Sequence, residues 1–196
     1  MATPEIRSND RILKEALELF STKGYEATSV REICLAAGIT KPTLYHFYGS
    51  KEGVYRALVD GTLEAFQRDL VRDLASSRSV IERLRQVARG YFESARQHRE
   101  LMRFIFSLIH SPVSSAPLTD FPRFYERIVA LIAKCVDEGV ARGELGPGPT
   151  DVRMLIFMGA LGECLCGNVL TGTPELTPEL ADALVDTLLR GWHPNP

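Results

Sequence analysis

The chain has 196 residues, of which 45% are hydrophobic and 24% are charged, an ordinary balance for a soluble globular protein. This length allows one large domain or two small ones, and four cysteines do not resemble a disulfide framework. The formal net charge of −2 gives no sign of a nucleic-acid partner, and the first ten residues lack the apolar run of a signal peptide. The composition therefore predicts a cytoplasmic protein.

The first predicted helix runs from about Asp10 to Lys23, with Ser8 or Asn9 as its cap and Gly24 at its end. Apolar residues recur in it at helical spacing, which gives it one face that can cover the helices that follow. These residues are Ile12, Leu13, Ala16, Leu17, Leu19 and Phe20.

The stretch from Ser29 to Glu52 predicts two short helices joined by a tight turn. Ser29 and Glu32 have the spacing of a capping box, so the first helix begins there. Gly38 supplies the positive φ that a tight turn needs, and Thr40 is a good cap for the second helix. This spacing predicts a helix-turn-helix.

The inward faces of these two helices follow from the same spacing. We expect Val30, Ile33, Cys34 and Ala37 to face inward from the first helix, and Leu44 and Phe47 to face it from the second. The residues left pointing outward can all donate hydrogen bonds and none is acidic, which suits a DNA major groove. They are Lys41, Thr43, Tyr45, His46 and Tyr48, followed by Lys51. An ordinary helical hairpin with a solvated face is the alternative.

Charge gives this interpretation limited support. Residues 1–56 contain eight Lys and Arg residues and seven acidic ones, a net charge of about +1. Any positive electrostatic potential at the helix-turn-helix must therefore come from where the charged residues lie, since residues 41–48 contain no acidic side chain.

The run GYEATSVREICLAAGITKPTLYHFYGSKEGVYRAL closely resembles the DNA-binding segment of the TetR family of bacterial transcriptional regulators. The resemblance covers about the first 60 residues. It implies a homodimeric, all-helical repressor whose second domain binds a small molecule that releases it from an operator. Carried over by position, the DNA contacts are Arg31, Lys41, Thr43, Tyr45, His46 and Lys51.

One pair of residues departs from the family. Members often have Tyr or His where this chain has Phe47, and Phe where it has Tyr48. Phe47 cannot donate a hydrogen bond to a phosphate. Either that contact is lost, or Tyr48 makes it from a shifted position.

The rest of the chain predicts only further helices, because no alternation of period two is present. Ser50 would cap a long helix to about Ala75, in which Gly53 and Gly61 either soften the link between domains or serve close packing. We predict an all-α fold of about nine helices, with a helix-turn-helix DNA-binding domain over residues 1–52 and an effector-binding and dimerisation domain over residues 53–196. The later helices are expected near residues 79–98, 101–109, 120–142, 150–171 and 177–190.

The helix near residues 150–171 has more apolar surface than one side of a small domain can cover. Its small residues Gly159, Ala160, Gly162 and Gly167 permit close helix packing, so we predict a homodimer through the last two helices. Burial within one chain is the alternative. Glu163 would pair across the dimer or bind a cationic ligand. Residues 154–170 are short for a membrane span and polar in part, which argues against a membrane.

Bulky side chains are abundant in the second domain, so we predict that it has a site for a small apolar or amphipathic effector. The candidate ligand-binding residues are Phe66, Tyr91, Phe104, His110, Tyr125 and Phe157.

No catalytic residue, cofactor or metal site is expected. Cys164 and Cys166 are two residues apart on a helix and point about 200° away from each other, so they cannot share a metal ion. HExxH, GxSxG and phosphate-binding glycine loops are missing from the sequence. The alternative function is a helix-turn-helix protein that acts through a protein partner or without a small-molecule effector.

Overall fold

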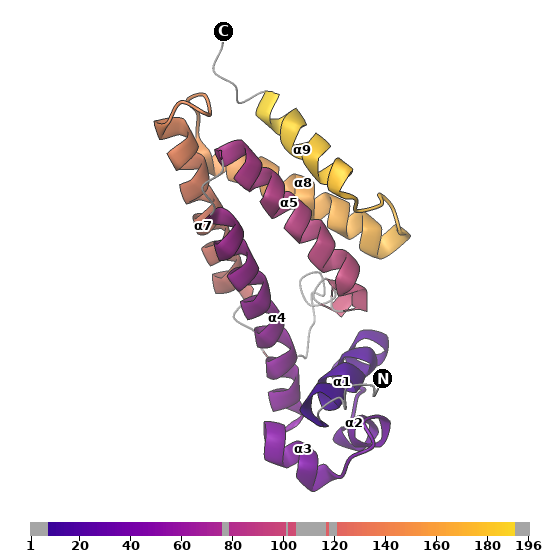
Figure 1. Ribbon diagram of the computed structural model, residues 1–196. Helices are drawn as coiled ribbons and strands as arrows, with labels where there is room; N and C mark the ends of the chain where they lie inside the picture. The colour runs from indigo at the N-terminus through magenta and orange to yellow at the C-terminus, as the bar shows by residue number, and fades with distance from the viewer. Residues whose placement is uncertain (1–7, 76–78, 101, 105–116, 118–120, 191–196) are drawn as a thin grey trace, which may run out of the picture. The chain divides into compact units, whose positions relative to one another are not determined.

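The computed structural model describes residues 8–75, 79–100, 102–104, 117 and 121–190, and every element assigned in them is a helix. The predicted all-helical fold is thereby confirmed (Figure 1). The helices are α1 (Ser8–Lys23), α2 (Val30–Ala36), α3 (Lys41–Tyr48), α4 (Lys51–Leu74), α5 (Val80–Gln97), α7 (Phe121–Ala141), α8 (Thr150–Thr171) and α9 (Pro178–Arg190).

The chain forms two compact units. The first comprises Met1–Leu63 and Glu100–Thr119, and the second comprises Glu64–Arg99 and Asp120–Pro196. The division falls within α4, later than the predicted boundary after residue 52. The first turns of α4 belong with the first unit because Tyr55 is buried there, its ring 5.9 Å from that of Phe20 in α1.

The first unit is built on α1, which packs against α2, while α2 packs against α3. Ile12, Ala16 and Phe20 of α1 are buried, as the helical spacing predicts. They share the core of this unit with Ile33 of α2 and Leu44 of α3, both fully buried. This core fixes the orientation of the two short helices.

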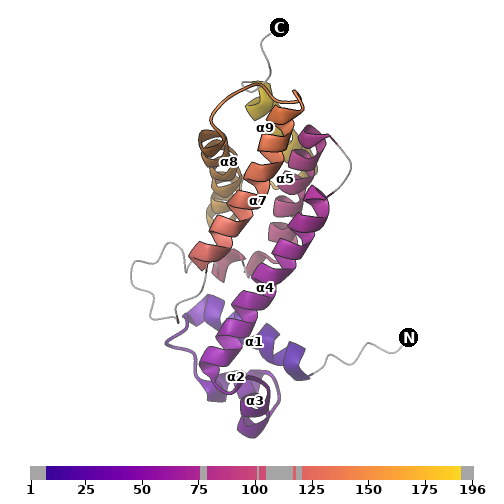
Figure 2. The same cartoon turned by 90° about the vertical axis from the view of Figure 1, so that its left-hand side faces the viewer.

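In the second unit, α5 packs along α9, and the two helices run side by side in Figure 1, while Figure 2 shows α7 in front, between α8 and α5. The same unit also brings α7 against both α5 and α8. The apolar residues of α5 recur at helical spacing and are buried. The buried apolar residues are Val80, Leu84, Val87, Ala88, Phe92 and Ala95.

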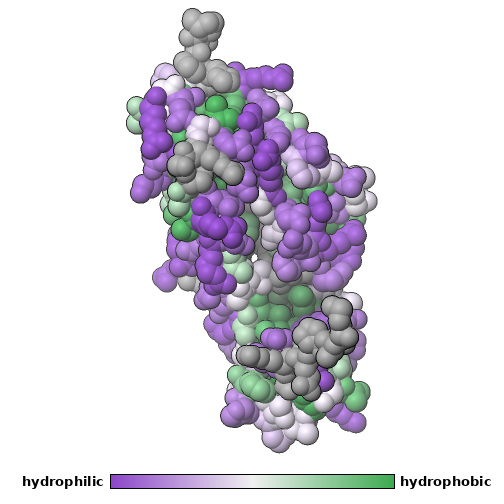
Figure 3. Space-filling view, viewed as in Figure 1, coloured by the Kyte–Doolittle hydropathy of each residue, from purple (hydrophilic) through white to green (hydrophobic). Residues whose placement is uncertain are grey.

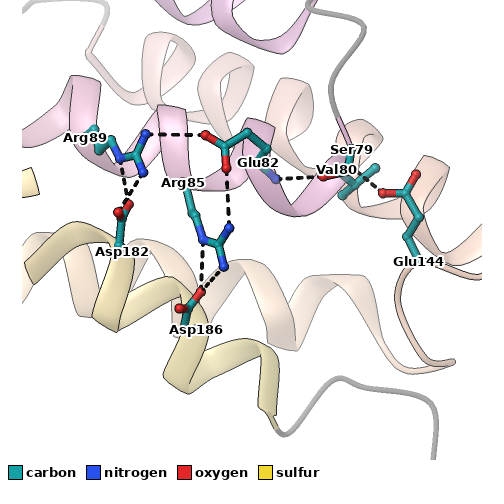
Figure 4. Close-up of polar contacts among 8 residues, drawn as sticks. All are labelled: Ser79, Val80, Glu82, Arg85, Arg89, Glu144, Asp182 and Asp186. Atoms are coloured by element: carbon teal, nitrogen blue, oxygen red, sulfur yellow. Dashed lines mark hydrogen bonds and ion pairs between the residues drawn. The ribbon is translucent and has the colours of Figure 1, made fainter. Parts of the chain in front are cut away.

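Ion pairs add to the contact between α5 and α9 (Figure 4). Arg85 binds Asp186 at 2.7 Å and Arg89 binds Asp182 at 2.6 Å, while Glu82 lies 3.4 Å from both guanidinium groups. The hydrogen bond from Arg89 lowers the pKa of Asp182 below its ordinary value. The surface of this unit that faces the viewer in Figure 3 is largely hydrophilic.

Candidate nucleic-acid interface and effector site

The start of α2 is held by a complete capping box. The Ser29 hydroxyl accepts a hydrogen bond from the Glu32 backbone N–H at 3.2 Å, and the Glu32 carboxylate accepts one from the Ser29 N–H at 2.8 Å. Lys23 donates to the same carboxylate at 2.7 Å and ties the end of α1 to α2. These bonds lower the pKa of Glu32 to about 2, with the Lys23 bond as the largest cause. The predicted cap is confirmed.

The turn between α2 and α3 has the predicted geometry. Gly38 has φ +61°, and the Ile39 N–H donates to the Cys34 carbonyl at 3.0 Å, which closes the end of α2. Thr40 then caps α3, because its hydroxyl accepts a bond from the Thr43 N–H at 3.4 Å. Cys34 is buried at the crossing of the two helices.

The outer face of α3 carries polar groups able to reach DNA. Lys41 and His46 are exposed, and 48% of Tyr45 is exposed. Thr43 is half-buried, with its hydroxyl oxygen 2.9 Å from that of Thr40. On α2, Arg31 is exposed in the first turn. The structure therefore leaves these five predicted DNA contacts on accessible positions.

Lys51 is arranged differently from the sequence expectation. Its ammonium group donates to the carbonyls of Tyr25 and Thr28 at 2.8 and 2.9 Å, and lies 4.1 Å from the centre of the Tyr25 ring. These contacts fasten α4 to the loop before α2. Lys51 thus orients the helix-turn-helix, and two of its three donors are used inside the chain.

Tyr48 and Phe47 also correct the sequence expectation. Tyr48 is half-buried, and its hydroxyl donates to the Asn9 carbonyl of α1 at 3.1 Å, so it does not point outward. Phe47 was expected to face α2, yet 48% of it is exposed. In this structure the contact with α1 holds the Tyr48 hydroxyl inward, so it does not occupy the surface position that the alternative with Tyr48 in place of Phe47 requires.

The connection from α3 to α4 depends on Gly53. A Cβ atom at this position would overlap the backbone carbonyl oxygen of Tyr48. By contrast, a Cβ at Gly61 would meet no atom within 4 Å. Of the two interpretations open from sequence, close packing therefore applies to Gly53 but not to Gly61.

A cluster of aromatic rings in the second unit is the candidate effector site. Phe66 of α4 lies edge-on to Tyr91 of α5, with ring centres 4.7 Å apart, and 6.2 Å from Phe124 of α7. The ring centre of Phe121 lies 6.0 Å from that of Phe124 and 6.4 Å from that of Tyr125. Phe124 is not among the residues predicted for the site, and the sequence offers Phe121 only as a bulky residue available for it. Their spacing with Tyr125, three and four positions apart, places all three on one helix face and was the available signal.

The aromatic cluster is partly exposed. Phe66, Tyr91 and Phe121 are half-buried, and 44% of Tyr125 is exposed. Even so, burial strongly raises the pKa of the Tyr91 phenol, and the nearby Tyr125 contributes to the rise. The Tyr91 phenol is therefore closely surrounded by its neighbours while part of the residue remains accessible.

The other predicted ligand residues lie elsewhere. Phe104 belongs to the core of the first unit, with its ring 6.0 Å from Phe20 and 5.5 Å from Tyr55, so it is not part of the aromatic cluster. Phe157 of α8 is buried. His110 lies outside the described residues.

The outward face of α8 is apolar and uncovered. Leu155 and Leu170 are 75% and 76% exposed, and Gly159 lies between them on open surface. Gly162 also has open space beside it, whereas Gly167 packs against the Thr173 carbonyl. Cys164 and Cys166 are separate thiols in this unbroken helix. We define the apolar face of α8 by Val152, Leu155, Ile156, Gly159, Gly162 and Leu170.

The helix has the predicted bounds, residues 150–171. Its 22 residues and its composition would suffice to cross a membrane, although 28% of its most apolar window is buried in the chain. Glu163 is exposed on it.

Comparison with known proteins identifies relatives of both units. Residues 12–58 match the family model for bacterial regulatory proteins of the tetR family. The regulator RutR of Escherichia coli is 31% identical over 155 residues, covering 75% of this chain and 68% of that protein. The probable regulator YttP of Bacillus subtilis is 29% identical over 104 residues, and the match spans only half of its length.

Solved structures share the fold over nearly the whole chain. The TetR-family regulator PfmR of Thermus thermophilus has a TM-score of 0.74 at 25% identity, with 97% of each chain covered. The regulator FadR of Bacillus subtilis, solved in complex with stearoyl-CoA, has a TM-score of 0.74 at 19% identity and covers 93% of this chain and 98% of that one.

Proposed function

Because the chain belongs to the TetR family of bacterial regulatory proteins, we propose that it is a cytoplasmic transcriptional repressor that binds an operator as a homodimer and is released by a small effector. The observation that carries this proposal is the outer face of α3, a short helix on a fixed scaffold that presents Lys41, Tyr45 and His46 to solvent. Such a face, without acidic residues, suits the major groove.

The contact set follows from which donors remain accessible. Lys41, Thr43, Tyr45 and His46 are proposed to contact base edges and phosphates from α3. Arg31 is proposed to bind a phosphate from the start of α2, where the helix dipole also favours an anion. Lys51 and Tyr48 are proposed to hold the orientation of α3, because their polar groups already bind backbone carbonyls.

The proposed dimer forms through α8 and α9. A second copy would cover the apolar face of α8, which is larger than scattered surface residues account for. Gly159 and Gly162, with open space beside them, allow close approach of a partner helix. Glu163, on the same exposed side, is proposed to pair across this interface.

The proposed effector is apolar or amphipathic and binds at the aromatic cluster around Phe66 and Tyr91. The rings supply apolar contact, and the Tyr91 and Tyr125 hydroxyls supply polar groups that can orient a ligand. FadR, which has the same fold, was solved with stearoyl-CoA, an amphipathic ligand, and this supports the class. Such an effector can release DNA only by its differential affinity for two arrangements of the dimer.

The test is selection of an operator from random duplex DNA, followed by titration at several salt concentrations. The parent protein is expected to select a near-palindrome and to bind it less tightly as salt rises. Arg31→Ala should weaken binding to all sequences and reduce the salt slope by about one, as for any lost phosphate contact. Lys134→Ala, an exposed lysine of α7 in the second unit, is the matched control.

Two results would overturn the proposal. Failure to enrich any sequence would exclude a specific operator and favour the alternative of a protein partner. Equal salt slopes for Arg31→Ala and Lys134→Ala would show that the α2–α3 face is not where DNA binds.

A further inference from the structure

Phe47 is an exposed apolar side chain on a helix whose other outer residues are mainly polar. Leu44, one turn earlier, is fully buried and fills the core beneath α3. The Phe47 ring lies outside that core, edge-on to the exposed His46 ring at 5.4 Å between centres. Nearly half of the phenyl surface is left accessible on the face proposed to meet DNA.

A phenyl ring at this position cannot form a hydrogen bond to a phosphate. It has no donor, and covering a phosphate oxygen with it would remove water without replacing the hydrogen bond. The neighbouring hydroxyl does not compensate, because the Tyr48 O–H is already donated to the Asn9 carbonyl at 3.1 Å. The end of α3 therefore offers apolar surface where a donor would be needed for a backbone contact.

The major groove contains one base group that matches such a surface. Among the four bases, only thymine presents a methyl group there, while the other groups are hydrogen-bond donors, hydrogen-bond acceptors or the smaller C5–H of cytosine. We propose that Phe47 packs on a thymine methyl group and makes the regulator select thymine at one position of each half-site. This inference rests on the proposed function, in which α3 enters the major groove.

The position of His46 supports a base contact for Phe47. Successive base pairs are separated by about 3.4 Å along each strand. The two ring centres, 5.4 Å apart, are thus within two base-pair steps of each other. If His46 reaches a base edge, the Phe47 ring therefore lies within two base pairs of it. The sugar–phosphate wall is the same for every sequence and would give no selection.

The experiment replaces each thymine of the selected operator, one position at a time, by deoxyuridine. Deoxyuridine lacks only the methyl group and keeps the O4 acceptor. The parent protein is expected to show one position per half-site at which this replacement weakens binding about fourfold, the effect of burying one methyl or methylene group. Replacing it in both half-sites should weaken binding roughly 16-fold. Phe47→Ala should bind the thymine and deoxyuridine operators equally.

Two further variants separate this contact from others. Tyr45→Ala removes the other half-exposed ring of α3 and should retain the deoxyuridine penalty. Phe47→Leu keeps an apolar side chain and should retain part of it.

The scan on the parent protein alone can overturn the inference. Tolerance of deoxyuridine at every position, or a penalty that persists in Phe47→Ala, would contradict it while leaving operator binding intact. Failure to select any operator would instead contradict the proposed function.

Discussion

Glu32 links three parts of the first unit through one carboxylate. It accepts hydrogen bonds from Lys23 at the end of α1 and from the Ser29 N–H, while its own N–H is capped by Ser29. All these bonds favour the charged carboxylate, which is why its pKa falls to about 2. The stability of the helix-turn-helix should therefore depend on pH in the acidic range.

The sign of this dependence follows from the lowered pKa. Glu32 stabilises the folded unit when it is charged, so its contribution is present above its ordinary value of 4.5 and is lost as the pH falls toward about 2. Glu32→Gln should flatten the loss of stability between these pH values. Lys23→Met removes the hydrogen bond that lowers the Glu32 pKa most but keeps the capping box. It should therefore flatten the pH dependence of stability less than Glu32→Gln does. Urea unfolding followed by circular dichroism at stepped pH would measure this, and unchanged curves for both variants would refute it.

The local features of the site could be predicted at this scale, and the distant contacts could not. Ser29 with Glu32, Gly38 and Thr40 act on backbone groups within a few positions, so their roles can be derived from spacing alone. Tyr48 and Lys51 have equally polar side chains, but their partners are 39 and 23 to 26 positions away. Nothing in the local pattern indicates that these donors turn inward.

The elements were predictable in kind, and their grouping was not. The apolar residues of α5 recur at helical spacing and form its buried stripe. The ranges predicted from the same periodicity are close to the observed bounds of α7, α8 and α9. The first part of α4 belongs to the first unit because the Tyr55 ring contacts the rings of Phe20 and Phe104. Phe104 is distant from Tyr55 in the sequence, so the pattern of apolar residues in α4 does not predict this contact. Periodicity identifies a buried face but does not identify its partner.

The two glycines in α4 give a matched prediction for this helix. Gly53→Ala should destabilise the first unit and weaken DNA binding, because the new Cβ would overlap the Tyr48 carbonyl and force α3 and α4 apart. Gly61→Ala should stabilise the protein by about 0.5–1 kcal/mol, since alanine favours the helix and no atom lies within 4 Å of the new Cβ.

Thermal or urea unfolding of both variants, with operator titrations, would measure these effects. Two opposite changes in stability are expected. A destabilising Gly61→Ala would mean that flexibility or an unseen contact matters there, and a neutral Gly53→Ala would show that the close approach to Tyr48 is not needed.

For the whole molecule, the apolar face of α8 determines what the chain can be on its own. Leu155 and Leu170 lie largely in solvent, and Val152 and Ile156 are also exposed, so this face has the apolar character of an interaction surface. A membrane would need to surround the helix on all sides, yet Met154, Phe157, Leu161 and Leu165 already face the chain's own core. A second copy needs only the uncovered face, and it doubles the number of recognition helices.

Gly162→Leu tests this dimer without disturbing the fold of one chain. A Cβ atom at Gly162 would meet no atom within 4 Å among the described residues, so a larger side chain is expected to extend toward a partner rather than into its own chain. Overpacking of about 1–3 kcal/mol should weaken dimerisation roughly 5- to 150-fold, with little change in the chain's own secondary structure.

Sedimentation velocity over a range of concentrations would measure the dimerisation constant, and circular dichroism would check the fold. Operator binding should become correspondingly concentration-dependent, because a monomer presents one recognition helix and engages one half-site. Asp69→Leu on the exposed side of α4 is a control for an added leucine away from α8 and should leave dimerisation unchanged. A parent protein that sediments as a monomer, or a Gly162→Leu variant that dimerises like the parent, would remove α8 from the interface.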